Sequence, residues 1–213
     1  MRKKILFVFI ILLIIVGGFF YWWIPNHQDN QRSEPPTLFE KGDYKVEDRA
    51  DGKYIVVDKV GLTAKVPDDW EIKKVEGSSY PKPGGWVELY SPDAGFESIL
   101  LVRGCGISIM SGKAEEDYQE IQNIINILEN NPNTNPEEFP YPYENYILEI
   151  MKINNYYALK WITPEKEITG KIMGVSIPMK NYNLIDITTS LPPNYEEKCS
   201  LIWEKFIKNL KIK

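Results

Sequence analysis

Residues 5–24, ILFVFIILLIIVGGFFYWWI, form an apolar run of twenty residues without one charged side chain. A helix of this length spans the hydrocarbon core of a bilayer. Three basic residues, Arg2, Lys3 and Lys4, precede the run and should stay in the cytoplasm, whereas aromatic rings crowd its far end and suit the outer interface. The sequence therefore predicts a single-pass anchor in the cell membrane, with a cytoplasmic N-terminus and an extracytoplasmic C-terminal part.

The alternative for this segment is a signal peptide that is cleaved on export. Such peptides end in a small-residue cleavage site after a shorter apolar region. Here Gly17 and Gly18 are followed directly by bulky aromatic residues, and no A-x-A pattern is present. The length and the flanks of the run favour an uncleaved signal anchor over residues 1–24.

The next segment, residues 25–42, is polar, contains three prolines and lacks apolar periodicity. These properties are typical of a flexible linker. The only histidine of the chain, His27, lies in this segment, and we expect it to be solvated rather than to act as a ligand or a base. Residues 43–213 then make up one extracytoplasmic domain.

The chain beyond the anchor is acidic. Three of the 25 basic residues precede the apolar run, so the remaining 22 face 30 acidic residues, and the net charge of this part is −8. A body with this charge and without a basic stripe is not suited to nucleic acid. It is equally unsuited to electrostatic docking on anionic lipid.

Most of residues 43–213 shows strand patterns. Over residues 99–110 the apolar side chains occupy mostly odd-numbered positions, which predicts a long strand with one buried face. Arg103 falls on the same face, so we expect this strand to bend or break at Arg103–Gly104. Two hairpins are predicted over residues 146–162 and 171–190. Successive hairpins indicate a mainly antiparallel sheet.

Two segments have apolar residues at spacings of three and four, the pattern of an amphipathic helix. The first lies between Ser111 and Pro132, and the second covers residues 194–209. Such helices need a surface to cover, and the sheet is the candidate. The predicted fold class is α+β: a mainly antiparallel sheet covered by two amphipathic helices and preceded by one transmembrane helix.

Two stretches resemble PsbP-like domains. Residues 61–72, GLTAKVPDDWEI, are a strand that runs into a Pro-x-x-Trp pattern, and residues 182–212 are a strand followed by a helix with a Phe-x-x-x-Leu pattern. The resemblance covers residues 51–213 and implies an α/β/α sandwich, shared by extrinsic photosystem proteins and many bacterial secreted proteins. It also implies an accessory or binding role rather than catalysis, and it supplies no functional residue.

Asp68 and Asp69 are an adjacent pair of carboxylates. A catalytic pair needs two different environments and a spacing that fits a substrate, whereas adjacent side chains diverge. In ordinary turns Pro fixes φ and Asp caps the backbone. We therefore interpret Pro67–Asp69 as the turn that brings Trp70 onto the core, with a weak surface calcium contact as the alternative.

Cys105 and Cys199, the two cysteines of the chain, fall on predicted inward faces. Outside the cytoplasm they can form a disulfide if their Cα atoms lie within about 7 Å, and otherwise they are two separate buried thiols. Catalysis by a thiol needs a nearby base, and one histidine with two cysteines excludes a zinc site. No G-x-S-x-G or Walker motif is present. The sequence predicts no catalytic residue, no metal and no cofactor.

Two loops rich in proline and aromatic residues, over residues 77–86 and 132–146, are the candidates for a binding surface. Exposed rings can stack on sugars or grip a peptide. The alternative is that the rings fold back onto the sheet as lids over the core. The candidate residues are Tyr80, Trp86, Phe139, Tyr141 and Tyr143.

These observations predict a membrane-anchored, extracytoplasmic binding or accessory module without catalytic activity. Its partners would be the membrane, through residues 5–24, and a protein or polysaccharide of the cell envelope. One alternative is a hydrolase of envelope polymers that uses scattered carboxylates. Another is a structural subunit of a membrane complex, since Gly17–Gly18 would let a second helix approach. Acidic side chains that converge in a cleft beside exposed aromatic rings would favour the hydrolase.

Overall fold

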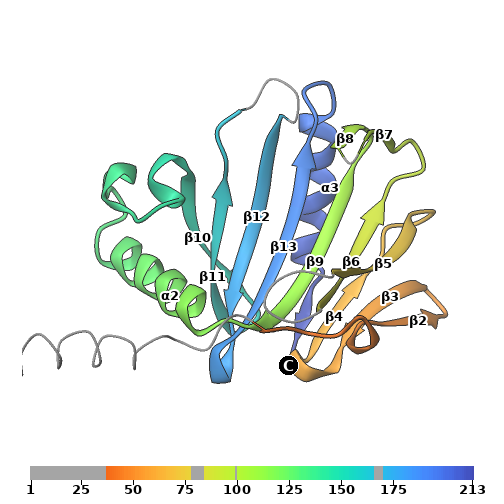
Figure 1. Ribbon diagram of the computed structural model, residues 1–213, viewed down its shortest axis with the longest axis horizontal. Helices are drawn as coiled ribbons and strands as arrows, with labels where there is room; N and C mark the ends of the chain where they lie inside the picture. The colour runs from red at the N-terminus through yellow and green to blue at the C-terminus, as the bar shows by residue number, and fades with distance from the viewer. Residues whose placement is uncertain (1–36, 78–83, 99, 166–169) are drawn as a thin grey trace, which may run out of the picture. The chain divides into compact units, whose positions relative to one another are not determined.

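Eight strands pair into the main antiparallel sheet of the domain (Figure 1). The computed structural model describes residues 37–77, 84–98, 100–165 and 170–213. Seven strands follow one another in the order β10-β11-β12-β13-β9-β6-β5, and β1 pairs with the end of β9. The bounds are β1 Thr37–Leu38, β5 Glu71–Gly77, β6 Gly84–Tyr90, β9 Gly106–Lys113, β10 Ile147–Ile153, β11 Tyr156–Ile162, β12 Lys171–Pro178 and β13 Asn183–Leu191.

Alternation of apolar and polar residues gives this sheet two unlike faces. In β13, Ile185 and Ile187 are completely buried, whereas Asp186, Thr188 and Ser190 are partly exposed. Successive side chains of a strand point to opposite faces. The apolar set therefore lies on a core face, and the polar set lies on the other face.

Two smaller sheets complete the strand structure of the described residues. One has four strands in the order β14-β4-β3-β2, and the other is the hairpin β7–β8. Ile55 and Leu62 of the four-stranded sheet are completely buried in the same cluster as the core face of the main sheet. The bounds are β2 Lys45–Arg49, β3 Gly52–Val57, β4 Leu62–Lys65, β7 Gly95–Glu97, β8 Leu100–Arg103 and β14 Lys211–Ile212; short 3-10 helices occur at η2 Lys41–Asp43, η3 Asp58–Val60, η4 Pro136–Glu138, η5 Tyr143–Asn145 and η6 Lys180–Tyr182.

The two helices of the described residues, α2 (Glu115–Asn130) and α3 (Glu196–Lys208), cover opposite faces of the main sheet (Figure 1). α3 buries its apolar stripe in the cluster that contains Ala158 of β11, whereas α2 packs in a second cluster that contains the next residue, Leu159. Neighbouring residues of a strand point to opposite faces. α2 therefore lies on the polar face, where it contacts β10, β11, β12 and β13.

The predicted fold class is wrong. The described residues are mostly antiparallel sheet with two helices, and residues 45–65 contribute to a sheet of their own instead of joining a single sheet covered by both helices. Alternation predicts each strand but not its partner, which is why this was missed. Within the described ranges no helix is long and apolar enough to cross a membrane, and the segment predicted to do so, residues 5–24, lies outside them.

The described part of the predicted linker, residues 37–42, is integrated into the domain. Thr37 and Leu38 form β1, and the Phe39 N–H donates to the Ser111 carbonyl at 2.9 Å. A Cβ on Gly112 would lie 2.7 Å from the Thr37 carbonyl oxygen, so a glycine at this position lets β1 approach β9. The remainder of the predicted linker, including His27, lies outside the described residues.

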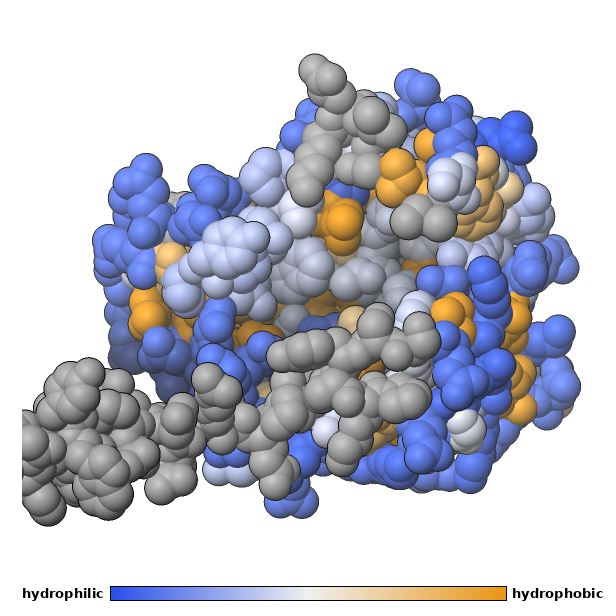
Figure 2. Space-filling view, in the orientation of Figure 1, coloured by the Kyte–Doolittle hydropathy of each residue, from blue (hydrophilic) through white to orange (hydrophobic). Residues whose placement is uncertain are grey.

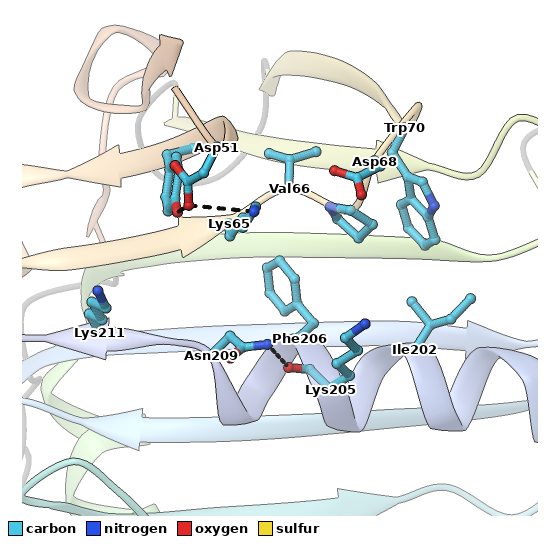
Figure 3. Close-up of a pocket in the computed structure, with 12 residues that line it drawn as sticks. Asp51, Lys65, Val66, Asp68, Trp70, Ile202, Lys205, Phe206, Asn209 and Lys211 are labelled. Carbon is cyan, nitrogen blue, oxygen red and sulfur yellow. Dashed lines mark hydrogen bonds and ion pairs between the residues drawn. The ribbon is translucent and has the colours of Figure 1, made fainter. Parts of the chain in front are cut away.

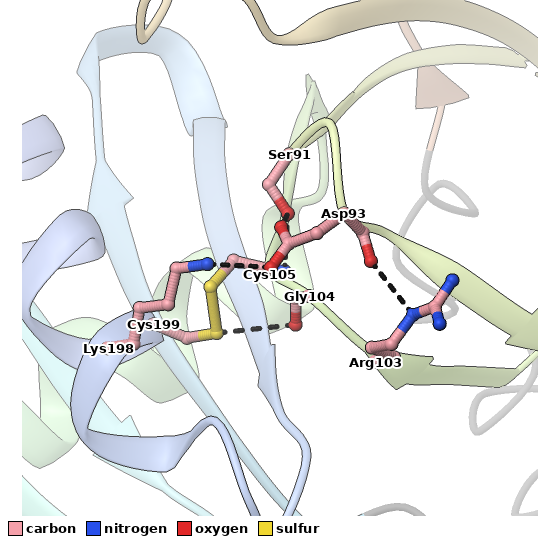
Figure 4. A network of polar contacts seen from close by, with 7 residues as sticks. All are labelled: Ser91, Asp93, Arg103, Gly104, Cys105, Lys198 and Cys199. Atoms are coloured by element: carbon pink, nitrogen blue, oxygen red, sulfur yellow. Dashed lines mark hydrogen bonds and ion pairs between the residues drawn. A yellow bond between two sulfur atoms is a disulfide. The ribbon is translucent and has the colours of Figure 1, made fainter.

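One disulfide joins the start of β9 to α3 (Figure 4). Cys105 bonds to Cys199, and their Cα atoms lie 5.3 Å apart. The sequence left open a bridge or two separate thiols, and the structure has the bridge. Next to it, Ser91 Oγ accepts a hydrogen bond from the Cys105 N–H at 2.8 Å and donates to Asp93 at 2.7 Å. Lys198 Nζ of α3 lies 2.7 Å from the same Asp93 carboxylate, which ties α3 to the turn before β7.

We expect the double variant Cys105→Ala/Cys199→Ala to lose about 2–5 kcal/mol of unfolding free energy, because a bridge across a long loop restricts the unfolded chain. The two cysteines are 94 positions apart. Urea unfolding of the full chain, followed by tryptophan fluorescence, measures the loss, and wild type in reducing agent should unfold at the same midpoint as the variant. Alkylation of both cysteines in unfolded but unreduced protein would contradict the bridge.

Candidate ligand-binding face

The face of the main sheet turned away from α3 is the candidate site. The apolar cluster beneath α2 includes residues of β11 and β13 but, among the described residues, none of β9 or β6. Figure 2 shows this region hollowed at its centre and lined by weakly polar residues. We call it the open face, and its partly exposed residues are Trp86, Glu88, Tyr90, Ser108, Met110, Asp186, Thr188 and Ser190.

Strand register arranges these side chains in rows across β6, β9 and β13. Residues that pair between neighbouring strands share a face and lie side by side. Each row runs across the three strands. The rows combine hydroxyl groups and carboxylates, and their aromatic rings lie on β6. They are Trp86–Met110–Asp186, Glu88–Ser108–Thr188 and Tyr90–Gly106–Ser190.

On β6, the Glu88 carboxylate is held between two aromatic side chains. Trp86 Nε1 donates to Glu88 Oε1 at 3.0 Å, and the Tyr90 hydroxyl donates to Oε2 at 2.8 Å. Burial, with the hydrogen bond to Glu88 second, raises the pKa of Tyr90, so that its hydroxyl stays a donor. A carboxylate has about four lone-pair sites. Glu88 is therefore fixed in position and can still accept hydrogen bonds from a ligand.

A cleft of about 340 Å³ lies beside this trio, between the sheet and the β7–β8 hairpin. Its apolar wall includes Phe96 and Leu100, which are 46% and 36% exposed. The Phe96 ring meets the Tyr90 ring edge to face, with 4.9 Å between centroids. Its polar floor includes Ser108 and Thr188. Apolar walls with a few placed polar groups are the usual composition of ligand sites.

At the α2 end of the open face, hydrogen bonds connect Trp161 to Asp186. Trp161 Nε1 donates to Ser176 Oγ at 3.1 Å, and Ser176 Oγ donates to Asp186 Oδ1 at 2.6 Å. A Cβ on Gly174 would collide with the Trp161 indole, so a glycine there lets the ring approach β12. Burial raises the pKa of Asp186 to about 6, with the charge of Asp117 on α2 as a smaller cause.

The two carboxylates of the open face lie on strands that are not neighbours in the sheet. Glu88 and Asp186 lie on strands separated by β9 and are offset by two positions in register. Strand spacing and rise place their Cα atoms roughly 12 Å apart. The arrangement suits two separate acceptors for one extended ligand.

The structure separates the five aromatic residues predicted to bind. Trp86 lies on the open face, and Tyr143 is partly buried at the α2 end, where burial raises its pKa. Phe139 is 5% exposed in the cluster beneath α2, so it acts as a lid over the core, and Tyr141 is 84% exposed. Tyr80 lies outside the described residues. The two predicted loops therefore do not form one surface of five rings.

Glu88, Asp186 and Trp161 were not predicted from the sequence to be functional residues. A usable pattern was present, because Trp-x-Glu-x-Tyr at residues 86–90 and Asp-x-Thr-x-Ser at 186–190 each put three polar or aromatic side chains on one strand face. The pattern does not show that both strands pair with β9. This pairing brings together residues that are about a hundred positions apart in the sequence.

Asp68 and Asp69 form the predicted turn. The Trp70 N–H donates to the Pro67 carbonyl at 3.3 Å, and Asp69 has a φ of 63°, in the left-handed region. Both carboxylates are exposed. Within the described ranges, no group of three or more His, Cys, Asp or Glu side chains is placed to hold a metal ion.

No protein-family model and no curated protein matches the sequence. A solved protein of Bacteroides thetaiotaomicron VPI-5482 is similar at 14% identity over 72% of this chain, with a TM-score of 0.39, and the chain spans 45% of its length. PA94 of Pseudomonas aeruginosa, described as a protein of unknown function and putative regulator, is similar at 11% identity over 81% of this chain and 99% of its own, with a TM-score of 0.35. Both structural similarities are too weak to indicate a function, and the PsbP-like resemblance stays a prediction.

We expect Asp186→Asn to stabilise the domain at neutral pH. The pKa of Asp186 is about 6 when folded and 3.8 ordinarily. The folded state therefore holds the proton more tightly, and the contribution of this group to stability falls as pH rises from about 4 to about 6. The variant should exceed wild type by about 1–3 kcal/mol at pH 7 and by little below pH 4.

Urea unfolding at several pH values between 4 and 7 measures this difference. Asp48→Asn, at an exposed carboxylate of β2, is the matched control and should follow wild type throughout. An Asp186→Asn protein whose advantage over wild type is the same at pH 4 and pH 7 would contradict the assignment.

Proposed function

We propose that the domain is a non-catalytic binding module of the cell envelope that holds a polysaccharide on the open face. The observation that carries the proposal is the Glu88 carboxylate, fixed between Trp86 and Tyr90 on a sheet face that the described helices leave uncovered. Sugars offer apolar C–H surfaces that pack on aromatic rings and hydroxyl groups that donate to carboxylates.

The remainder of the open face has the same mixed chemistry. Ser108, Thr188 and Ser190 add hydroxyl groups that both donate and accept, in register with Glu88 and Tyr90. A ligand that reached Glu88 and Asp186 together would lie across three strands. This favours an extended polymer over a compact small molecule.

The proposed location is the extracytoplasmic side of the cell membrane, to which the apolar residues 5–24 anchor the chain. The length of this run and the three basic residues before it support the proposal. The disulfide between Cys105 and Cys199 supports it as well, because disulfides persist in oxidising compartments and are rare in the cytosol.

A hydrolase of envelope polymers is the second candidate, and one observation favours it. Asp186 has a pKa of about 6 beside the charge of Asp117. A carboxyl group whose pKa is raised by burial can act as a general acid near neutral pH.

We expect Glu88→Gln to weaken binding of the full chain to insoluble peptidoglycan by about tenfold or more, because hydrogen bonds to a charged acceptor are the stronger ones. Co-sedimentation of detergent-solubilised protein with peptidoglycan measures the affinity. Tyr90→Phe should weaken it less, since the Glu88 charge remains and only its orientation is released.

The matched control is Glu204→Gln, at an exposed residue of α3 on the other side of the main sheet. Equal sedimentation of wild type, Glu88→Gln and Glu204→Gln would reject the open face as the binding surface. Release of soluble glycan fragments that stops in Asp186→Asn would replace the binding module by the hydrolase.

The proposed location predicts that protease added to intact spheroplasts degrades residues 43–213. The same treatment should leave a cytoplasmic marker protein untouched. The measurement is immunoblotting for a tag at the C-terminus before and after the addition of detergent. Full-length chain in the soluble cytosolic fraction, or a domain that is protected until detergent is added, would be incompatible with this location.

A further inference from the structure

A second hollow, of about 490 Å³, lies between the turn after β4 and the helix α3 (Figure 3). It shares no residue with the open face, because α3 covers the opposite side of the main sheet. We call it the lysine-rimmed groove. Its volume falls within the range of about 300–1,000 Å³ that is usual for small-molecule sites.

The floor of the lysine-rimmed groove is apolar. Val66 and Phe206 are 2% and 4% exposed, and Trp70 and Ile202 are partly buried against the same core. Ile202 and Phe206 are four residues apart and so lie on one side of α3. Figure 3 shows Ile202 and Phe206 on the α3 side of the groove and Trp70 on the side of the turn. The Pro67–Trp70 turn is what leaves the indole at this position.

The rim carries three lysines from three elements: Lys65 at the end of β4, Lys205 in α3 and Lys211 in β14. Lys65 Nζ lies 3.5 Å from the Asp51 carboxylate, which also accepts a hydrogen bond from the Tyr54 hydroxyl at 2.6 Å. Lys205 and Lys211 are exposed, and no described carboxylate lies within ion-pair distance of either ammonium group.

The charge of this rim differs from that of the domain. The lining contains three lysines against Asp51 and Asp68, whereas the chain as a whole has 25 basic and 30 acidic residues. Two cations without an ion-pair partner among the described residues border an apolar floor, and this combination complements a ligand with an anionic head and an apolar body. Asp51 and Asp68 of the lining would repel a broad anionic surface such as a bilayer, so a single molecule fits better.

We propose that the lysine-rimmed groove binds a free single-chain amphiphilic anion, with its carboxylate at Lys205, which Figure 3 shows beside Ile202 and Phe206, and its apolar body on Trp70, Ile202 and Phe206. This site is independent of the polysaccharide on the open face. Binding involves no covalent step. Charge holds the anionic end of the ligand, and burial of apolar surface holds its apolar body.

Photo-crosslinking of the full chain tests this proposal. The chain is placed in nanodiscs of zwitterionic lipid and exposed to two probes with the same diazirine-bearing ten-carbon tail, one with a carboxylate head and one with a trimethylammonium head. Mass spectrometry of α3 peptides measures labelling. The carboxylate probe should label α3 at least tenfold more than the cationic probe.

The double variant Lys205→Gln/Lys211→Gln should lower labelling by the carboxylate probe about five- to tenfold, in line with the loss of the charge contact at Lys205 and of the second positive charge along the rim. Lys208→Gln, on the same helix but outside the groove lining, is the matched control and should label like wild type. Thermal unfolding of each variant checks that the fold is unchanged.

Three results would overturn the proposal. The first is equal labelling by the two probes. The second is an equal effect of Lys208→Gln and the double variant, which would show that the lysines act only through the general positive charge near the end of α3. The third is loss of labelling when the discs contain anionic phospholipid, because a lipid headgroup would then be the occupant in place of a free amphiphile.

Discussion

The unlike faces of the main sheet are the constraint on which the rest of the structure depends. Val87, Ile109 and Ile187 are completely buried on one face, which needs an apolar cover, and α3 and the four-stranded sheet supply it from opposite ends of the domain sequence. The bond between Cys105 and Cys199 holds this cover against β9. The other face is apolar only toward β10–β13, where α2 lies, and the open face is the remainder.

The two hollows differ because they arise in different ways. The open face is an uncovered strand surface, so its side chains are the polar half of an alternating pattern, with Glu88 and Asp186 as acceptors. The lysine-rimmed groove is a seam between layers, where the turn after β4 does not close completely on α3. This seam leaves Trp70, which packs against the core, partly exposed, and surface lysines border it. Each site therefore suits a different ligand chemistry.

Local patterns predicted many elements. The strand expected over residues 99–110 breaks near Arg103–Gly104 into β8 and β9, and Gly104 has a φ of 76° at the break. The helix expected over residues 194–209 is α3, and Pro67–Asp69 is a turn. The fold class failed because residues 45–65 pair with one another and with β14, a partnership that no local pattern contains. Burial of Phe139 in the core, which no local pattern predicted, means that the aromatic loops do not present all five rings on one surface.

The sequence by itself determined where strands, helices and turns occur, the acidic charge of the body and the apolar run at residues 5–24, because periodicity, charge and hydrophobicity are properties of neighbouring residues. Only the tertiary structure decided which sheet face is covered, that Glu88 and Asp186 share one face of the main sheet, and that Lys205 and Trp70 line the same groove. These juxtapositions depend on strand pairing and layer packing between distant parts of the chain, which are selected by burial of the whole core rather than by any one segment.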